Sequence, residues 1–181
     1  MPTVLKKRLE RAERIAVLAI GSRLRGDDAA GLLAAEELSR LIASPAVGRP
    51  SSVVGRPSSV VKIFMGETTP ENLTGEIKRF KPTHLIVMDA ADIDEDPGEF
   101  RLLDSERVAG MSASTHNLPV RLVTDYLRKC VGCEAVIIGI QPQSCGFGQA
   151  VSREVAAGAK RTARALAEAL QDRLRPNGNG R

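Results

Sequence analysis

The sequence HLIVMDAAD, from His84 to Asp92, holds the clearest structural signal in the chain. Its four consecutive apolar residues, Leu85 to Met88, are typical of a strand buried on both faces, because a strand with one solvated face alternates apolar and polar residues. The run ends at the carboxylate of Asp89. In an open parallel sheet, ligands bind beyond the carboxyl ends of the strands. We therefore expect Asp89 at the functional edge, with a partner that offsets the cost of burying its charge.

Other strands and helices alternate along the chain. Continuous apolar runs predict central strands at 15–20 and 135–140, and shorter runs predict a strand at 60–64 and an edge strand at 100–103. Apolar residues at helical spacing predict helices at 32–43, from about 71 to 80, around Pro119 to Leu127, and at 154–174. This alternation predicts an α/β fold in which the loops after the strands meet at one edge.

Composition narrows the class of protein. A chain of 181 residues with 43% hydrophobic content can form one compact domain, and its net charge of +4 lies largely in the two terminal segments. With 3% aromatic residues and no Trp, base-stacking surfaces for nucleic acid are not expected. There is no apolar run of 18 residues, the first apolar run is too short for a signal peptide, and the three cysteines are an odd number. We expect a cytoplasmic protein that does not insert into a membrane.

The domain organisation follows from these segments. We expect a basic N-terminal extension at 1–14 that is mainly a solvated arm, a single α/β domain at 15–174, and a flexible tail at 175–181. Residues 43–60 contain the heptad VGRPSSV twice in succession, at 47–53 and 54–60. Gly, Pro and Ser predict an exposed loop there, and two copies of seven residues are too few for a solenoid.

The loop after the first strand, GSRLRGDDAAG at 21–31, is rich in glycine, as phosphate-binding loops are. It contains no G-x-G-x-x-G, and no Gly-Lys-Ser/Thr follows its second glycine, so it matches neither common nucleotide cradle. It does place Asp27 and Asp28 at the start of a helix. One of them can cap the helix, and for Asp28 a capping role and a role in the site are equal alternatives.

Asp28, Asp89 and His116 are the candidate site residues. His116 lies in a small polar loop just before a helix, and the topology can bring it to the same edge as the two aspartates. Two carboxylates and one imidazole suit zinc, nickel, iron or manganese, and this donor set does not select among them. Because the chain has no G-x-S-x-G or H-E-x-x-H motif, any hydrolysis would be metal-assisted.

Other ionisable groups are assigned structural or solvated roles. His84 lies at the end of the central strand opposite Asp89, and the acidic loop at 92–96 lacks the spacing of a calcium site. Asp92 alone in that loop is close enough in sequence to Asp89 to merit attention. Cys130 and Cys133 form a Cys-x-x-Cys without a second pair, and with Cys145 they are expected to be structural thiols.

Six segments in consistent order resemble the nickel-iron hydrogenase maturation endopeptidases, most closely the member that processes formate-hydrogenlyase-type hydrogenases. The resemblance spans about residues 15–170 and rests on GSRLRGDDAAG at 21–31, TPEN at 69–72, KPTHLIVMDAAD at 81–92, PGEFRLLD at 97–104, STHN at 114–117 and GIQP at 139–142. One departure stands out. The family usually has Gly-x-Gly-Asn after the first strand, where this chain has Ala19-Ile20-Gly21-Ser22.

The resemblance implies a three-layer α/β/α sandwich with a twisted, mainly parallel five-stranded sheet, acting as a monomer. It implies an endopeptidase that removes the C-terminal extension of a hydrogenase large-subunit precursor after nickel insertion. By position, the family's catalytic and metal-binding residues fall on Asp28, Asp89 and His116, where some relatives have glutamate in place of Asp28. The nickel would be carried by the substrate, with no metal tightly bound to the isolated protein.

Two other functions remain open from the sequence. A metal-dependent hydrolase would hold its own zinc and would purify with stoichiometric metal. A non-catalytic module would bind the nickel-loaded precursor and leave its C-terminus intact.

Overall fold

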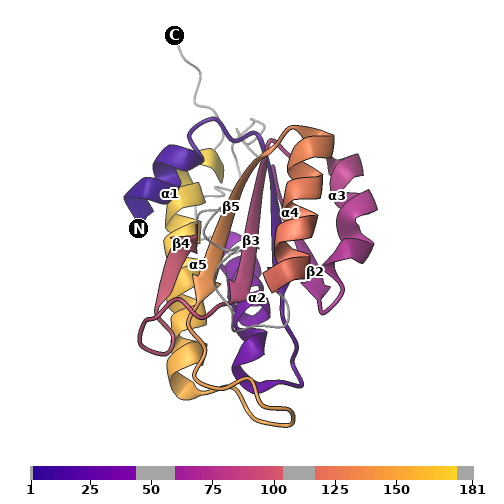
Figure 1. Cartoon of the computed structure of the whole chain (residues 1–181). Helices are drawn as coiled ribbons and strands as arrows, with labels where there is room; N and C mark the ends of the chain where they lie inside the picture. Colours follow the sequence, from indigo (N-terminus) through magenta and orange to yellow (C-terminus); the bar gives the residue numbers. More distant parts are fainter. Residues whose placement is uncertain (1, 44–59, 104–116, 175–181) are drawn as a thin grey trace.

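A five-stranded sheet lies between two layers of helices in the computed structural model, which describes residues 2–43, 60–103 and 117–174 (Figure 1). The strand order is β2-β1-β3-β5-β4. Neighbouring strands are parallel except β4, which pairs antiparallel with β5 at one edge. The strands are β1 (Arg14–Ile20), β2 (Val60–Glu67), β3 (His84–Ala90), β4 (Phe100–Leu103) and β5 (Glu134–Ile140). The expected α/β/α sandwich with a mainly parallel five-stranded sheet is confirmed.

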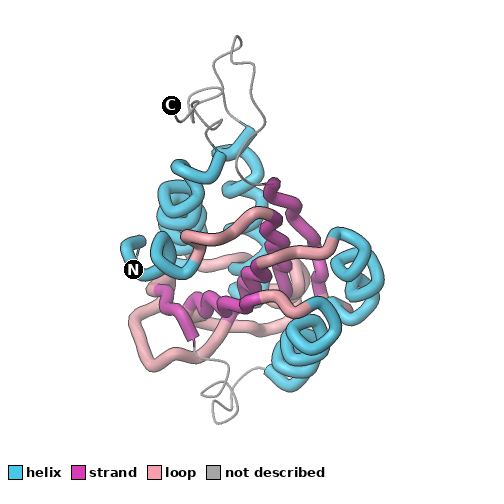
Figure 2. The backbone as a smooth tube through the Cα atoms, turned by 90° about the horizontal axis from the view of Figure 1, so that it is seen from above, coloured by secondary structure: helices cyan, strands magenta, loops and turns pink. Residues whose placement is uncertain are grey.

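The helices divide between the two faces of the sheet, as the view along it shows (Figure 2). One face is covered by α1 (Pro2–Arg8), α2 (Ala30–Ala43) and α5 (Arg153–Leu174). The other is covered by α3 (Thr74–Phe80) and α4 (Asn117–Val131). Two short 3₁₀ helices, η1 (Gly26–Ala29) and η3 (Pro70–Leu73), lead into α2 and α3.

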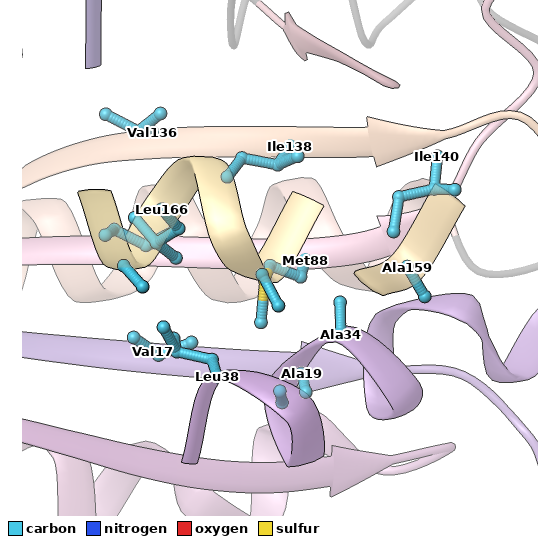
Figure 3. Packing of buried hydrophobic residues seen from close by; sticks show 14 of the residues in the cluster. Val17, Ala19, Ala34, Leu38, Met88, Val136, Ile138, Ile140, Ala159 and Leu166 are labelled. Atoms are coloured by element: carbon cyan, nitrogen blue, oxygen red, sulfur yellow. The ribbon is translucent and has the colours of Figure 1, made fainter. Parts of the chain in front are cut away.

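The central strand explains the continuous apolar run. All seven residues of β3 are buried, because Ile86 and Met88 face the α2 and α5 layer while Leu85 and Val87 face α3 and α4. Figure 3 shows the first of these two cores, in which side chains of β1, β3 and β5 meet those of α2 and α5.

The N-terminal segment differs from the expected solvated arm. Leu5 and Leu9 lie one helical turn apart and are fully buried, and with Ala12 they belong to the core that includes α5. Lys6 and Lys7 of the same helix are exposed. The prediction of a solvated arm was wrong. Two leucines four residues apart are enough for an apolar stripe when a neighbouring helix offers a matching surface.

Several predictions fall on residues that the structure does not describe. These are the duplicated heptad up to residue 59, His116 and the tail at 175–181. Across the described ranges, none of the helices has the length and apolar character needed to span a membrane.

Candidate functional site

Asp89 lies near the end of the central strand, at the carboxyl edge of the sheet, which is at the bottom of Figure 1. It is 3% exposed and pairs in register with Gly139 of β5. The loops that follow β1 and β5 turn at this edge. The prediction that Asp89 lies at the carboxyl edge of the sheet, where ligands bind in open parallel sheets, therefore agrees with the observed topology.

Asp28 reaches the same edge because two glycines allow the chain after β1 to turn closely. Gly21 has φ +134°, and a Cβ there would lie 1.9 Å from the carbonyl oxygen of Asp28. Gly31 opens α2 against the ends of β1 and β3, where a Cβ would lie 2.4 Å from the carbonyl oxygen of Met88. Only glycine permits these approaches, so the turn brings the 3₁₀ helix η1 over the end of β3.

The charge of Asp28 acts on the carboxyl group of Asp89. Burial raises the pKa of Asp89 to about 8, the negative charge of Asp28 adds to the rise, and a backbone hydrogen bond from Ala90 partly opposes it. Asp28 is itself only 2% exposed. The Oδ1 atom of Asp89 is buried and has no hydrogen-bond partner among the residues that the structure describes. Two buried carboxyl groups whose charges interact form an environment that a cation would stabilise.

Asp27 has a different task from its neighbour. Its Oδ2 accepts hydrogen bonds from the backbone N–H groups of Gln143 at 2.9 Å and Ser144 at 3.1 Å, and its Oδ1 accepts from that of Ser152 at 2.6 Å. Asp27 therefore holds the loop after β5. The expected capping role is not observed, since the 3₁₀ helix has Arg25 at its N-cap and no side-chain capping bond.

Backbone hydrogen bonds also join the two loops directly. The N–H of Asp27 donates to the carbonyl of Ser144 at 3.0 Å, and the N–H of Gly148 donates to that of Leu24 at 2.8 Å. Gly26, with φ +52°, lies so close that a Cβ would be 2.8 Å from the same Ser144 oxygen. Loop 21–29 and loop 141–152 thus form one hydrogen-bonded rim around the buried carboxyl groups.

Cys145 belongs to this rim. Burial raises the pKa of the Cys145 thiol to about 11, and the negative charges of Asp28, Asp27 and, more weakly, Asp89 add to the rise. The thiol is therefore within electrostatic reach of the site, which its position in the sequence did not indicate. All three cysteines carry free thiols, so the two cysteines of the Cys-x-x-Cys motif are not joined by a disulfide.

The other polar residues that the sequence analysis singled out, His84 and Asp92, contact neighbouring polar groups of the fold. His84 is buried at the start of β3, where Nδ1 lies 3.1 Å from Oγ1 of Thr83, in agreement with its assigned role. Asp92 is exposed, and its Oδ1 accepts from Gln141 Nε2 at 3.4 Å. Gln141 also accepts from the backbone N–H of Ile93 at 2.8 Å, so it orders the loop after β3.

Sequence reasoning missed the roles of Asp27 and Gln141. Asp27 was recognised only as one of an acidic pair, and Gln141 only as part of GIQP. In both cases the signal is a polar residue directly at the end of a buried strand or at a tight turn.

His116 lies outside the described residues, so its position relative to the two aspartates remains a prediction. Within the described part of the chain, no three His, Cys, Asp or Glu side chains are arranged so that they could hold a metal ion. The two buried aspartates supply carboxylate oxygens, which suit nickel together with an imidazole nitrogen. His116 is the residue that the sequence analysis predicts as a third ligand.

Comparisons with known proteins identify the family. The family model for hydrogenase maturation proteases matches residues 52–171. The hydrogenase 3 maturation protease of Escherichia coli is 33% identical over 132 residues, which cover 72% of this chain and 74% of that protein. A putative hydrogenase maturation protease of Methanocaldococcus jannaschii is 28% identical over 172 residues, covering 95% and 97% respectively.

Solved structures give the same result. The crystal structure of the NiFe hydrogenase maturation protease HycI from Thermococcus kodakarensis superposes with a TM-score of 0.75 at 35% identity, over 92% of this chain and 98% of that one. A crystal structure of the hydrogenase 3 maturation protease gives 0.66 at 29% identity, over 84% and 88%. The resemblance seen in the six sequence segments is thereby confirmed, and the chain belongs to the hydrogenase maturation protease family.

Proposed function

We propose that this protein is an endopeptidase that removes the C-terminal extension of a nickel-iron hydrogenase large-subunit precursor after nickel has been inserted. The observation that carries the proposal is the pair of buried carboxyl groups, Asp28 and Asp89, at the carboxyl edge of the sheet. Family membership supports the protease activity. The nickel, the C-terminal cleavage and the three site residues are the proposal.

The nickel is treated as part of the substrate. Asp28 and Asp89 would contribute carboxylate oxygens to it, and His116 an imidazole nitrogen. A nickel-loaded precursor would bring a positive charge that favours the ionised form of both carboxyl groups. Without nickel, Asp89, whose pKa is raised to about 8, would keep its proton. This difference provides a physical basis for accepting only the loaded precursor.

Within the chain, different residues have separate tasks. Asp27 and the hydrogen bonds between loops 21–29 and 141–152 hold the rim of the site in one geometry. The two buried aspartates orient the metal-bearing segment of the precursor against that rim. When bound, the nickel would supply a Lewis acid to the site.

The intact mass of a hydrogenase large-subunit precursor, measured after incubation with and without loaded nickel, tests this function. Loss of a C-terminal peptide from the loaded form alone is the expected result. Cleavage of both forms would indicate a hydrolase with its own metal, and this protein would then purify with stoichiometric zinc. Binding of the loaded precursor without any cleavage would indicate a non-catalytic module.

Variants of the three proposed residues test the site. Asp28→Ala, Asp89→Ala and His116→Ala are each expected to reduce cleavage of the loaded precursor at least about 100-fold, as loss of a catalytic group does. The melting temperature should stay within a few degrees, measured by circular dichroism. Asp96→Ala is the matched control, because that carboxylate is exposed and should leave cleavage unchanged. Retained cleavage by His116→Ala would remove this residue from the site.

We also propose that the protein acts in the cytoplasm as a monomer. Three free cysteines are consistent with a reducing compartment. Light scattering should give the mass of one chain, 19.4 kDa, and a mass of twice that value would rule out the monomer.

A further inference from the structure

The rim of the site carries two exposed apolar side chains that the proposed chemistry does not use. Phe147 is 79% exposed and Leu24 is 64% exposed, the two highest values among the exposed large apolar residues of the described chain. The other four, between 44% and 60% exposed, are Val4, Val60, Leu122 and Tyr126. Single exposed apolar residues are common on protein surfaces, so exposure alone indicates little. The position and the rigidity of these two residues set them apart.

The two residues lie beside each other on the joined loops. Leu24 accepts a backbone hydrogen bond from Gly148, at 2.8 Å, and Gly148 directly follows Phe147. The residues are far apart in sequence and come together only because loops 21–29 and 141–152 pair at the carboxyl edge of the sheet. An exposed leucine and an exposed phenylalanine therefore start from adjacent points of the rim.

Both positions are held by hydrogen bonds. On the first loop, the N–H of Leu24 donates to Oγ of Ser22 at 3.3 Å. On the second, Oγ of Ser144 donates to Oε1 of Gln149 at 2.5 Å, and Gly148 adopts φ +74° to close the turn after Phe147. Side chains presented by an ordered backbone lose little conformational entropy when a partner covers them.

The pair adjoins the buried carboxyl groups. Cys145, two residues before Phe147, feels the charges of Asp28 and Asp89. Leu24 is four residues before Asp28 on the same loop, in which the N–H of Asp28 donates to the carbonyl of Arg25 at 3.1 Å. Asp28 itself lies on loop 21–29, so a polypeptide that presents a metal to it would approach the loop that carries Leu24.

We propose that Leu24 and Phe147 are substrate-binding residues, which accept apolar side chains of the hydrogenase precursor next to its metal-bearing segment. This inference rests on the proposed function, since it assigns the occupant as the precursor. Aromatic side chains such as that of Phe147 are enriched at protein interfaces, and an ordered backbone lowers the entropy that binding costs. Because they lie beside the reacting groups and not among them, they contribute to binding and not to the chemical step.

The test compares Leu24→Ala and Phe147→Ala with the wild-type protein on a nickel-loaded precursor. We expect KM for cleavage, and Kd for the precursor measured by surface plasmon resonance, to rise about tenfold for Phe147→Ala and less for Leu24→Ala. The value of kcat should remain within about twofold. Phe147→Leu should recover most of the affinity, because it restores an apolar side chain.

Val60→Ala is the matched control. Val60 is 51% exposed and begins β2 at the opposite end of the sheet, so its loss should leave KM and kcat unchanged. If the wild-type protein cleaves the loaded precursor, and Leu24→Ala and Phe147→Ala have the same KM and kcat as Val60→Ala, this inference is overturned. The proposed function would then still stand. A fall in kcat at unchanged KM would also overturn this inference, because the residues would then act in the chemical step. Failure of the wild-type protein to bind or cleave any loaded precursor would overturn the proposed function itself.

Discussion

The two ends of the sheet treat charged groups in opposite ways. At the carboxyl end, Asp27, Asp28 and Asp89 are all 3% exposed or less. At the amino end, a pocket of about 570 Å³ is lined by basic residues that include Arg14, Lys78 and Lys81, each able to reach water. Buried carboxyl groups require a specific reason to be retained, whereas solvated cations do not.

The basic pocket has a structural explanation. Its walls are the last turns of α3 and α4, and carbonyl groups at helix C-termini favour nearby positive charge. Arg14 Nε donates to the carbonyl oxygen of Lys81 at 2.6 Å, and Lys78 Nζ lies 3.1 Å from the hydroxyl of Tyr126. These cations stabilise the ends of helices, and the pocket does not need a ligand to account for them.

The comparison of the two ends of the sheet indicates which end is suited to a functional site. Positive charges beside helix C-termini at the amino end reduce the energy of the folded chain, whereas at the carboxyl end burial and the charge of Asp28 disfavour the ionised form of Asp89. A site that is unfavourable in the isolated protein can become favourable when a cation-bearing substrate binds. Four variants test this contrast.

The largest effect on stability is expected for Asp27→Ala. This variant leaves three backbone N–H groups of loop 141–152 without their charged acceptor, which should cost about 3 kcal/mol or more in unfolding free energy. Urea unfolding measures the loss, and cleavage of a loaded precursor should fall with it. Asp96→Ala, which removes an exposed carboxylate, should change neither. A stability equal to that of Asp96→Ala would show that Asp27 does not hold the rim.

Leu5→Ala should be the next largest. Leu5 is fully buried between α1 and the core that includes α5, and truncation of a buried leucine typically costs about 2–4 kcal/mol. Leu24→Ala serves as the comparison, because that side chain is 64% exposed and its loss should cost no more than about 0.5 kcal/mol. Equal unfolding midpoints for the two variants would mean that α1 is a solvated arm after all.

Asp89→Asn should stabilise the metal-free protein in a pH-dependent way. With a pKa raised from 3.8 to about 8, folded Asp89 keeps a proton that the unfolded chain releases, so wild-type stability falls as pH rises between these values. Below about pH 4, Asp89 is protonated in both the folded and the unfolded chain. This group should then make no difference to the unfolding free energies of the wild type and the variant. Above pH 8 the variant should be more stable by at least about 1 kcal/mol. Urea unfolding at pH 5, 7 and 9 measures this, and a gap that shrinks with rising pH would contradict it.

The smallest effect is expected at the amino end, for Lys81→Gly. Lys81 ends α3 with φ +51°, a left-handed conformation that glycine adopts without strain. We expect a gain of about 0.5–1 kcal/mol in unfolding free energy and unchanged cleavage of the precursor. Lys81→Ala separates backbone strain from charge, because it removes the ammonium group and keeps the Cβ. A gain of equal size in that variant would attribute the effect to charge.

Local patterns were sufficient for most of the fold. A strand covered on both faces must be apolar throughout, so the runs ending at Ile20, Met88 and Ile140 indicated three central strands. The edge position of the strand at 100–103 could also be predicted from the sequence, because only a short apolar stretch lies there between two polar stretches. The N-terminal helix was misread since its partner, α5, is more than 140 residues away in the sequence.

The site was only partly readable. The residue types and strand ends pointed to Asp28 and Asp89, and parallel topology explains why they meet. The division of labour within the Asp27–Asp28 pair was not readable, because it depends on which carboxylate faces the N–H groups of Gln143, Ser144 and Ser152.

The amino-acid sequence alone therefore specified the strands, their burial and the carboxylate at the end of β3, because these follow from apolar periodicity over a few residues. The tertiary structure was needed to identify Asp27 as the residue that holds the rim, to bring Cys145 near the site and to join Leu24 to the turn at Phe147. These contacts link segments more than 100 residues apart. Their hydrogen bonds and charges form only after the sheet has brought its loops to one edge, and no local pattern encodes that geometry.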